Sequence, residues 1–450
     1  MLINKSGNGV KISAVRRETT PLQGNAPQSY WPRLAKTNKD AYYRACRSNN
    51  KYSRPDMSAI LVSGNNRLFP LEAYRGIAAF IVLVHHFFLG FSPYTTGLLG
   101  EARNEDSLIG QPFFALFNGT AAVGFFFTLS GFVLCWSYFN HENPQKLLLA
   151  FLKRFPRLAA IVTITTVASY CLFRLNFYYF HDASKLSLSP WLATFAQGWT
   201  PGFEPSFWEA LTQGMTTFFT GEDNYNTNLW TMKAEFFGSM IVFMLACFIS
   251  VILEYRYLIY AFIIISISAL FYNNFIFPFV AGTFLSVYLA KNKTEIPFYT
   301  AIALIIFGLY MLGYIIPEKS YAWASAIPDI MKVHTQTLLH TLGSACIIFA
   351  TMSNQKVFKN LNGKLLRGIG KISFPLYLVH TLVICSLSSY VYIKLSNHGI
   401  SNTQSLIIVF IVTATTSIAL AVPLSRFDDW WVNQVNTTTR KLLKEKQLVH

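Results

Sequence analysis

The sequence predicts an all-α protein, a polytopic transmembrane helix bundle of about ten spans. Of its 450 residues, 52% are hydrophobic and only 13% are charged, which is about half of the roughly 25% charged residues of a soluble domain. Ten apolar segments are long enough, or nearly long enough, to cross a bilayer. Lysines and arginines are also distributed unevenly among the connecting segments. These three observations exclude a soluble globular fold.

The predicted spans are apolar runs of roughly 16 to 23 residues, near the length that crosses the hydrocarbon core. They centre on 71–91, 121–139, 156–175, 230–252, 257–272, 275–290, 297–316, 336–352, 372–393 and 403–424. Only Asn273 and Asn274 separate the short pair 257–272 and 275–290. This pair could form a re-entrant hairpin instead, which would leave the topology of the later spans unchanged.

The chain divides into three parts. Residues 1–67 are polar and basic, and we expect a disordered cytoplasmic tail that either attracts anionic membrane lipid or only aids orientation. Residues 68–430 form the transmembrane domain, and residues 431–450 form a cytoplasmic C-terminal tail. Between the third and fourth spans, an aromatic-rich outer segment includes residues 206–219, which could form an amphipathic helix at the membrane interface.

Basic residues predict the orientation. With a cytoplasmic N-terminus, 29 lysines and arginines lie on the inner side and 6 on the outer side, while Arg75 and Lys233 lie inside spans. This is the asymmetry of the positive-inside rule. We therefore expect both termini in the cytoplasm of an integral, multi-pass protein of the plasma or cell inner membrane, or of an endomembrane. The net charge of +16 follows from this topology, so nucleic acid is not an expected partner.

Several familiar catalytic patterns are missing from the sequence. It has no His-x-x-Glu-His, Cys-x-x-Cys or Gly-x-Ser-x-Gly stretch, so neither a metal site nor a serine hydrolase is expected. Five of the six cysteines fall within predicted spans, which argues against a disulfide framework. Ser130 and Gly131 indicate close helix packing rather than a nucleophile.

The first span carries ionisable residues at unusual depth. His86 follows Arg75 by eleven positions, which corresponds to roughly 16 Å along a helix and places the imidazole near mid-membrane. Ionisable groups persist at such depth when they face a bundle interior or a cavity, and they commonly mark functional sites. His85 points about 100° away from His86, so only one of the two can face a given site.

Other spans and their ends contribute further polar residues. Glu235 in the fourth span could orient an imidazole, donate a hydrogen bond when protonated, or clamp two helices. His380 in the ninth span could be a second base, a substrate contact or a buried structural histidine. Arg154 and Arg157 lie three positions apart at the predicted cytoplasmic mouth, where they could bind phosphate or serve only as a positive-inside anchor. Arg75 could bind the same polyanion or pair with Glu72.

Five stretches of this sequence together resemble the membrane-bound acyltransferase-3 family. In chain order they are the stretch 71–79 with His86, then 125–134, 153–157, 229–236 and 370–380. The resemblance continues over most of residues 68–430. It departs at Lys233, where the family usually has a small or apolar residue. The resemblance implies an O-acyltransferase that uses acyl-CoA as co-substrate, with acetyl-CoA expected. It also implies a hydroxyl acceptor on a saccharide or glycosylated product, or alternatively on a small molecule or lipid.

The resemblance also implies roles for individual residues. His86 would be the general base, since a neutral imidazole near pH 7 suits deprotonation of a hydroxyl. Glu235 and His380 would complete the catalytic group. Arg75, Arg154 and Arg157 would bind the phosphates of the donor.

A secondary transporter is the main alternative, because transporters also carry ionisable residues near the midplane. The sequence shows no internal repeat, and the basic pair Arg154 and Arg157 fits a cytoplasmic anionic donor. Both observations favour the acyltransferase. A structural scaffold is a more distant third possibility.

Overall fold

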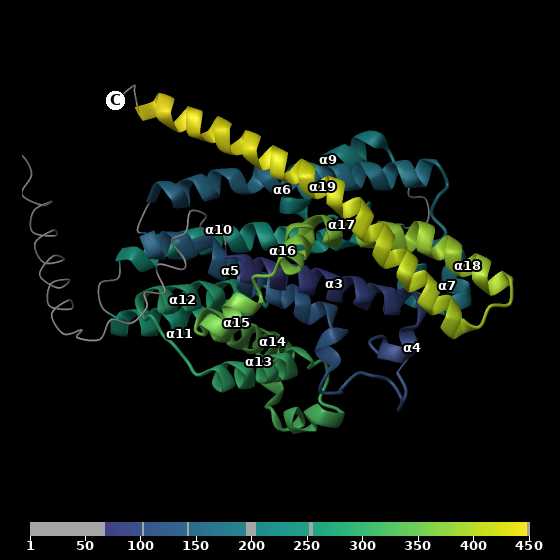
Figure 1. The fold of residues 1–450 in the computed structure, drawn as a ribbon, viewed down its shortest axis with the longest axis horizontal. Helices are drawn as coiled ribbons and strands as arrows, with labels where there is room; N and C mark the ends of the chain where they lie inside the picture. Colours follow the sequence, from purple (N-terminus) through teal and green to yellow (C-terminus); the bar gives the residue numbers. More distant parts are fainter. Residues whose placement is uncertain (1–67, 101–102, 142–143, 195–203, 252–254, 448–450) are drawn as a thin grey trace, which may run out of the picture. The chain divides into compact units, whose positions relative to one another are not determined.

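In the computed structural model, the described residues form a bundle of α-helices (Figure 1). The structure describes residues 68–100, 103–141, 144–194, 204–251 and 255–447. The tail predicted for residues 1–67 lies outside them. An all-α fold is therefore confirmed for the described part of the chain.

The described helices follow one another along the chain. They are α3 (Phe69–Phe91), α4 (Pro93–Thr96), α5 (Gly119–His141), α6 (Pro144–Arg174), α7 (Phe180–Ser187), α8 (Pro190–Ala193), α9 (Phe207–Thr220), α10 (Trp230–Val251), α11 (Tyr255–Tyr272), α12 (Ile276–Lys291), α13 (Phe298–Leu312), α14 (Asp329–Met352), α15 (Gln355–Asn360), α16 (Lys364–Lys371), α17 (Ser373–Val383), α18 (Ser389–Asn397) and α19 (Asn402–Gln447). Short 3-10 turns lie at Phe114–Leu116, Thr227–Leu229 and Lys319–Ala326, and a π-helical turn at Ile384–Ser388 joins α17 to α18.

Five helical stretches in the described residues are long and apolar enough to cross a membrane. They are Phe69–Phe91, Gly119–Asn140, Thr227–Val251, Ser373–Asn397 and Asn402–Lys441, and three shorter apolar helices are Tyr257–Tyr272, Ile276–Lys291 and Phe298–Leu312. The two other predicted spans, 156–175 and 336–352, fall on α6 and α14. Multiple long apolar helices support an integral, multi-pass membrane protein, whereas ten crossings stay a prediction.

Glycines allow the central helices to approach closely. α5 packs against α3, α10 and α12 (Figure 1). A Cβ atom on Gly131 of α5 would lie 2.2 Å from the carbonyl oxygen of Phe279 in α12, and one on Gly282 would lie 2.0 Å from that of Thr128. Only glycine permits these backbone approaches. The close packing predicted for this stretch is confirmed at Gly131.

The predicted amphipathic helix at 206–219 is present as α9, but it lies lengthwise along α6. Phe207 contacts Tyr170 near one end of α6, and Phe218 contacts Phe155 further down the same helix. Gly214 of α9 meets the backbone of α6 between these contacts. α9 therefore buries one face against α6, and its place at the membrane interface stays a prediction.

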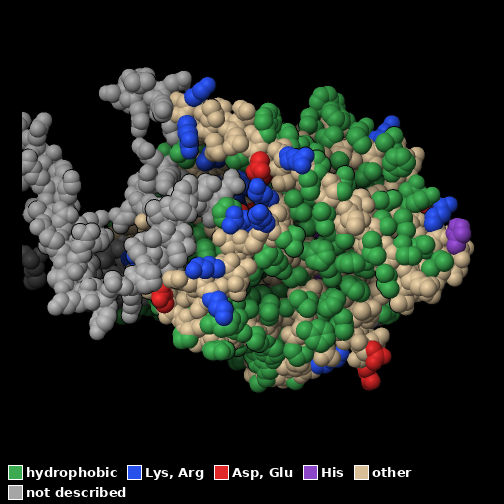
Figure 2. Space-filling model, in the orientation of Figure 1, with side chains coloured by type: hydrophobic (Ala, Val, Ile, Leu, Met, Phe, Trp, Pro, Cys, Tyr) green, Lys and Arg blue, Asp and Glu red, His purple; other side chains and the backbone are tan. Residues whose placement is uncertain are grey.

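α19 is one continuous helix, and it runs through the predicted boundary at residue 430. Beyond its apolar part it packs along α6, where the Trp431 indole donates to the carbonyl of Pro156 (2.7 Å) and Lys153 donates to Asn436 (2.7 Å). Figure 2 shows a largely hydrophobic face whose visible Lys and Arg side chains gather mainly toward the left. The C-terminal end of α19 lies on that side in Figure 1.

Candidate active site

A cavity of about 310 Å³ lies among α3, α5, α6, α10, α17 and α19. Basic and acidic side chains both line it. The charged lining residues are Glu72, Arg75, Arg154, Arg157, Glu235, Lys371, Asp428 and Asp429, and the others include Val123, Phe126, Phe127, Ser130, Thr231 and Tyr377. The three predicted donor-binding arginines and Glu235 therefore face one space.

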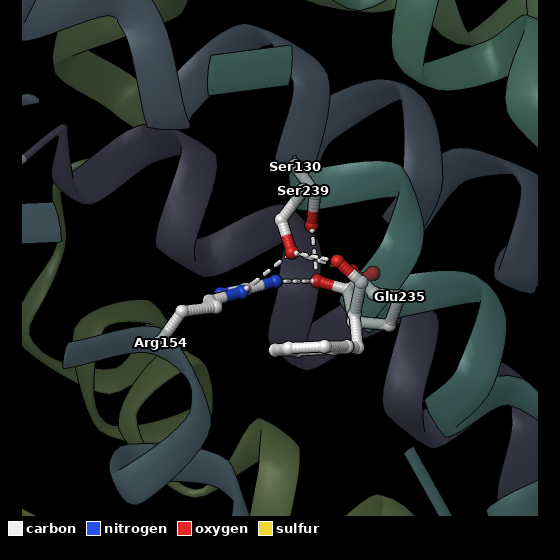
Figure 3. Close-up of polar contacts among 5 residues, drawn as sticks. Ser130, Arg154, Glu235 and Ser239 are labelled. Atoms are coloured by element: carbon white, nitrogen blue, oxygen red, sulfur yellow. Dashed lines mark hydrogen bonds and ion pairs between the residues drawn. The ribbon is translucent and has the colours of Figure 1, made fainter. Parts of the chain in front are cut away.

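Arg154 and Glu235 form an ion pair in the wall of this cavity (Figure 3). The guanidinium also donates from Nε to Oγ of Ser239 (3.0 Å), and the Ser130 hydroxyl donates to the Glu235 carboxylate (2.8 Å). Ser239 lies one helical turn after Glu235, so both polar groups face the same side of α10. Arg154 is only 8% exposed. A buried charge of this kind needs a partner, and Glu235 supplies it.

Arg157 has a different environment from Arg154. Its side chain is 48% exposed, and its Nη2 atom lies 4.0 Å from Oδ2 of Asp428 on α19. This contact is long and partly in solvent, so it is a weak interaction. Arg157 is therefore available to an anion that enters the cavity.

His86 contacts His380 rather than Glu235. Nδ1 of His86 lies 2.8 Å from Nε2 of His380, and the two ring planes differ by 12°. His380 is fully buried on α17, just before the π-helical turn, a kind of irregularity that is frequent at functional sites. The indole of Trp191, on α8, lies parallel to the His86 ring with centroids 5.1 Å apart. The aromatic-rich segment between α6 and α10 thus reaches His86 through Trp191.

His85 is buried against the turn that precedes α5. Its Nδ1 atom lies 2.9 Å from the carbonyl oxygen of Phe117 and 3.1 Å from the backbone nitrogen of Gly119, the first residue of α5. A Cβ atom on Gly119 would lie 2.6 Å from the His85 ring. Asn118 caps the same helix by accepting from the backbone N–H of Ala121 (3.1 Å). His85 therefore contributes to the start of α5.

The structure places the predicted site residues in two groups. Arg75, Arg154, Arg157 and Glu235 line the cavity, whereas His86 and His380 lie outside its lining. Tyr377 connects the groups, since it lines the cavity and its ring centroid lies 6.1 Å from that of His380. The Tyr377 hydroxyl is within hydrogen-bonding distance of Thr231 Oγ1 (2.9 Å) and of the Asn228 carbonyl (3.1 Å). Tyr377 thus neighbours both the cavity and His380.

Sequence reasoning missed several residues of this region. Tyr377 could have been found from its position one turn before His380, and Ser239 from its position one turn after Glu235. Lys371, Asp428 and Trp191 gave no comparable signal, because they reach the site only when distant helices pack together. In the described residues, no group of three or more His, Cys, Asp or Glu side chains could hold a metal ion.

The long apolar helices and the intramembrane polar groups define a multi-pass membrane protein with a charged internal cavity. The family model of the acyltransferase domain, which defines the acyltransferase 3 family, matches residues 71–426 of this chain. The match covers most of the chain, which belongs to this family, and the resemblance found in the sequence is confirmed. The family implies an acyltransferase and hence an acyl donor and an acceptor. No curated protein and no solved structure matches the chain.

Proposed function

We propose that this protein is an integral membrane O-acyltransferase that moves an acyl group, expected to be acetyl, from cytoplasmic acyl-CoA to a hydroxyl of a saccharide or glycosylated product. One observation carries the proposal within the family. A hydrogen-bonded histidine pair, His86 and His380, lies next to Tyr377, which lines a cavity that contains four basic and four acidic side chains. A base next to an anion-binding cavity is what acyl transfer from a phosphorylated thioester requires.

The cavity suits the phosphorylated end of the donor. Arg75, Arg157 and Lys371 line it, and the weak contact between Arg157 and Asp428 can be exchanged for a charge-assisted hydrogen bond to phosphate. Arg154 would contribute a fixed positive charge from the wall, with Glu235 holding its position. A volume of about 310 Å³ lies at the lower end of the range of small-molecule sites, so only part of a CoA molecule would be enclosed.

His86 would act on the acceptor. The imidazole accepts the hydroxyl proton as the oxygen attacks the thioester carbonyl, and it returns that proton to the sulfur when the C–S bond breaks. The hydrogen bonds of Tyr377 to Thr231 and Asn228 hold its ring at the cavity wall, next to His380. We propose that the thioester reaches His86 past this ring, with Tyr377 displaced.

The proposal includes a topology. Residues 68–430 would form the catalytic domain with ten crossings, and the tails 1–67 and 431–450 would lie in the cytoplasm. The excess of basic residues on the predicted inner side supports this arrangement. So does the position of the C-terminal end of α19 on the side where basic side chains gather in Figure 2. This orientation would give the charged cavity access to cytoplasmic CoA.

The direct test is release of CoA thiol by purified protein in lipid nanodiscs supplied with acetyl-CoA. Glycans extracted from cells that lack the protein serve as the acceptor pool, and mass spectrometry identifies the product. We expect thiol release that depends on acceptor and is lost in His86→Ala. Thiol release by His86→Ala at the wild-type rate would contradict the proposed base. Transport of an unmodified solute without thiol release would contradict the proposed reaction.

A further inference from the structure

The hydrogen bonds of His380 determine which nitrogen of His86 carries hydrogen. Nδ1 of His380 lies 3.0 Å from the carbonyl oxygen of Leu376, one turn earlier on α17. A carbonyl oxygen only accepts, so this nitrogen of His380 is the donor. A neutral imidazole carries one hydrogen, and Nε2 of His380 is therefore an acceptor.

The accepting Nε2 of His380 in turn determines the hydrogen position on His86. Its Nδ1 atom lies 2.8 Å from the accepting Nε2 of His380, so Nδ1 of His86 donates. Nε2 of His86 is then left with a free lone pair. We propose that His380 is a positioning residue that holds His86 in the tautomer with hydrogen on Nδ1, so that Nε2 is the atom that accepts the acceptor's proton. This inference rests on the proposed function, in which His86 is the base.

This arrangement differs from one in which a carboxylate orients the base. Glu235, the carboxylate expected for that task, is bound to Arg154 and Ser130. Here the backbone carbonyl of Leu376 ends the chain of hydrogen bonds that a carboxylate would otherwise end. This series of hydrogen bonds contains no negative charge. The direction in which its members donate is set by one backbone acceptor on α17.

Neighbouring rings restrict the orientation of His86. Trp191 lies parallel to one face, with an 11° angle between ring planes. His85 lies edge-on, with its ring at 61° to that of His86 and its Nδ1 atom engaged by the turn before α5. A flip of the His86 ring would break the hydrogen bond to His380. The packing therefore supports the orientation that the hydrogen bond selects.

The proton of the acceptor hydroxyl can be followed through His86 and His380 to the CoA thiol. When Nε2 of His86 accepts the hydroxyl proton, the ring carries two hydrogens, and the one on Nδ1 is shared with Nε2 of His380. The acceptor oxygen bonds to the acyl carbon and the C–S bond breaks. Nε2 of His86 then gives its proton to the departing thiolate, which leaves both imidazoles in their starting forms. The net change is transfer of one proton from the acceptor hydroxyl to the CoA thiol.

The tautomer can be measured without any activity. The ¹⁵N NMR spectrum of histidine-labelled protein distinguishes protonated from unprotonated ring nitrogens, and loss of signals in His86→Gln assigns those of His86. We expect hydrogen on Nδ1 and a free Nε2 in the wild-type protein. In His380→Leu the hydrogen should move to Nε2. A wild-type His86 with hydrogen on Nε2 would overturn the inference, whatever the outcome of the activity assay.

The kcat of His380 variants provides a second test, because a purely structural role of His380 would not give the pattern expected here. His380→Leu should lower kcat by about a hundredfold or more, with little change in donor KM, because it removes orientation of the base. His380→Gln should recover part of the loss, since its amide can accept from His86 and donate to Leu376. Equal kcat values for the Gln and Leu variants would contradict the inference.

His340 provides the matched control. It is likewise buried, at 3% exposure, and Nε2 of its ring lies 2.7 Å from the carbonyl oxygen of Tyr314. No hydrogen bond connects it to His86 among the described residues. His340→Gln should leave both the tautomer of His86 and kcat unchanged. If His86→Ala abolishes transfer while His380→Leu leaves kcat and the tautomer intact, the proposed function stands and this inference fails.

Discussion

At the scale of single residues, the two adjacent histidines of α3 have different environments and so different expected roles. His86 contacts His380 and Trp191, whereas His85 contacts the turn before α5. His86→Ala should lower kcat by roughly 10²-fold or more, the contribution typical of a general base, and leave donor binding intact. His85→Ala should instead lower thermal stability. Thiol release and thermal unfolding measure the two effects, and the opposite pattern would reverse the assignment.

The ion pair between Arg154 and Glu235 predicts a stability effect. Arg154→Met should lower the free energy of unfolding by about 3–5 kcal/mol, because it leaves the carboxylate unpaired in the interior. The double variant with Glu235→Met should recover most of this loss, since neither charge remains. Thermal unfolding in detergent measures both variants. Additive losses in the double variant would show that the two side chains do not act as a pair.

Arg157 predicts a binding effect instead. Arg157→Ala should raise the donor KM by about tenfold, since a charge-assisted hydrogen bond contributes about 1.5–3 kcal/mol. Stability should change little because the side chain is half exposed. Lys153→Ala is the control, since Lys153 lies on the same helix but does not line the cavity. A donor KM that is unchanged in Arg157→Ala would reduce Arg157 to an orientation signal.

At the scale of elements, close packing of α5 and α12 supports the cavity wall formed by Ser130. Gly131→Ala should lower the free energy of unfolding by about 1–3 kcal/mol, because its Cβ would overlap the backbone of α12 and neither helix can yield easily. Gly124→Ala on the same helix is the control, since its nearest neighbour would be His340 Cβ at an ordinary 3.6 Å. Equal unfolding temperatures for the two variants would contradict this packing.

The segment between α9 and α10 is not α-helical, yet it is anchored inside the bundle by two asparagine side chains. Asn226 and Asn228 lie in this break and are buried. Their side-chain amides donate to the carbonyls of Leu378 (2.8 Å) and Tyr377 (2.6 Å) on α17. Both amides thus bind backbone carbonyls of α17 inside the bundle, where a polar side chain without a partner would be costly. The same contacts fix the position of Tyr377 relative to the start of α10.

At the scale of the whole molecule, the proposed topology places the two ends of one span on opposite sides. Gly363 is the residue before α16, which leads into α17, and Asn397 ends α18; both are exposed. In a background without native cysteines, Asn397→Cys should react with an impermeant reagent from outside the cell. Gly363→Cys should react only after permeabilisation, because the segment from 356 to 371 is basic and predicted to be cytoplasmic. The reverse pattern would invert the topology and remove the cavity from cytoplasmic CoA.

The sequence by itself determined the class of protein and its family. Apolar length and low charge are sufficient for the class, because a bilayer accepts only segments that satisfy their own backbone hydrogen bonds. The family follows from local motifs in a constant order. Each motif lies within one short stretch of the chain, so the family can be recognised without knowing how the helices pack. The depth of His86 relative to Arg75 is also a property of a single helix.

Only the tertiary structure decided which polar groups meet. Glu235 is separated from Arg154 by 81 positions, and His86 from His380 by 294 positions. The sequence offered a carboxylate as one possible partner for the imidazole, whereas the packed helices bring it a second imidazole. Partner choice depends on the rotation and offset of each helix about its axis. Interactions among many apolar neighbours set these quantities, and no local motif records them.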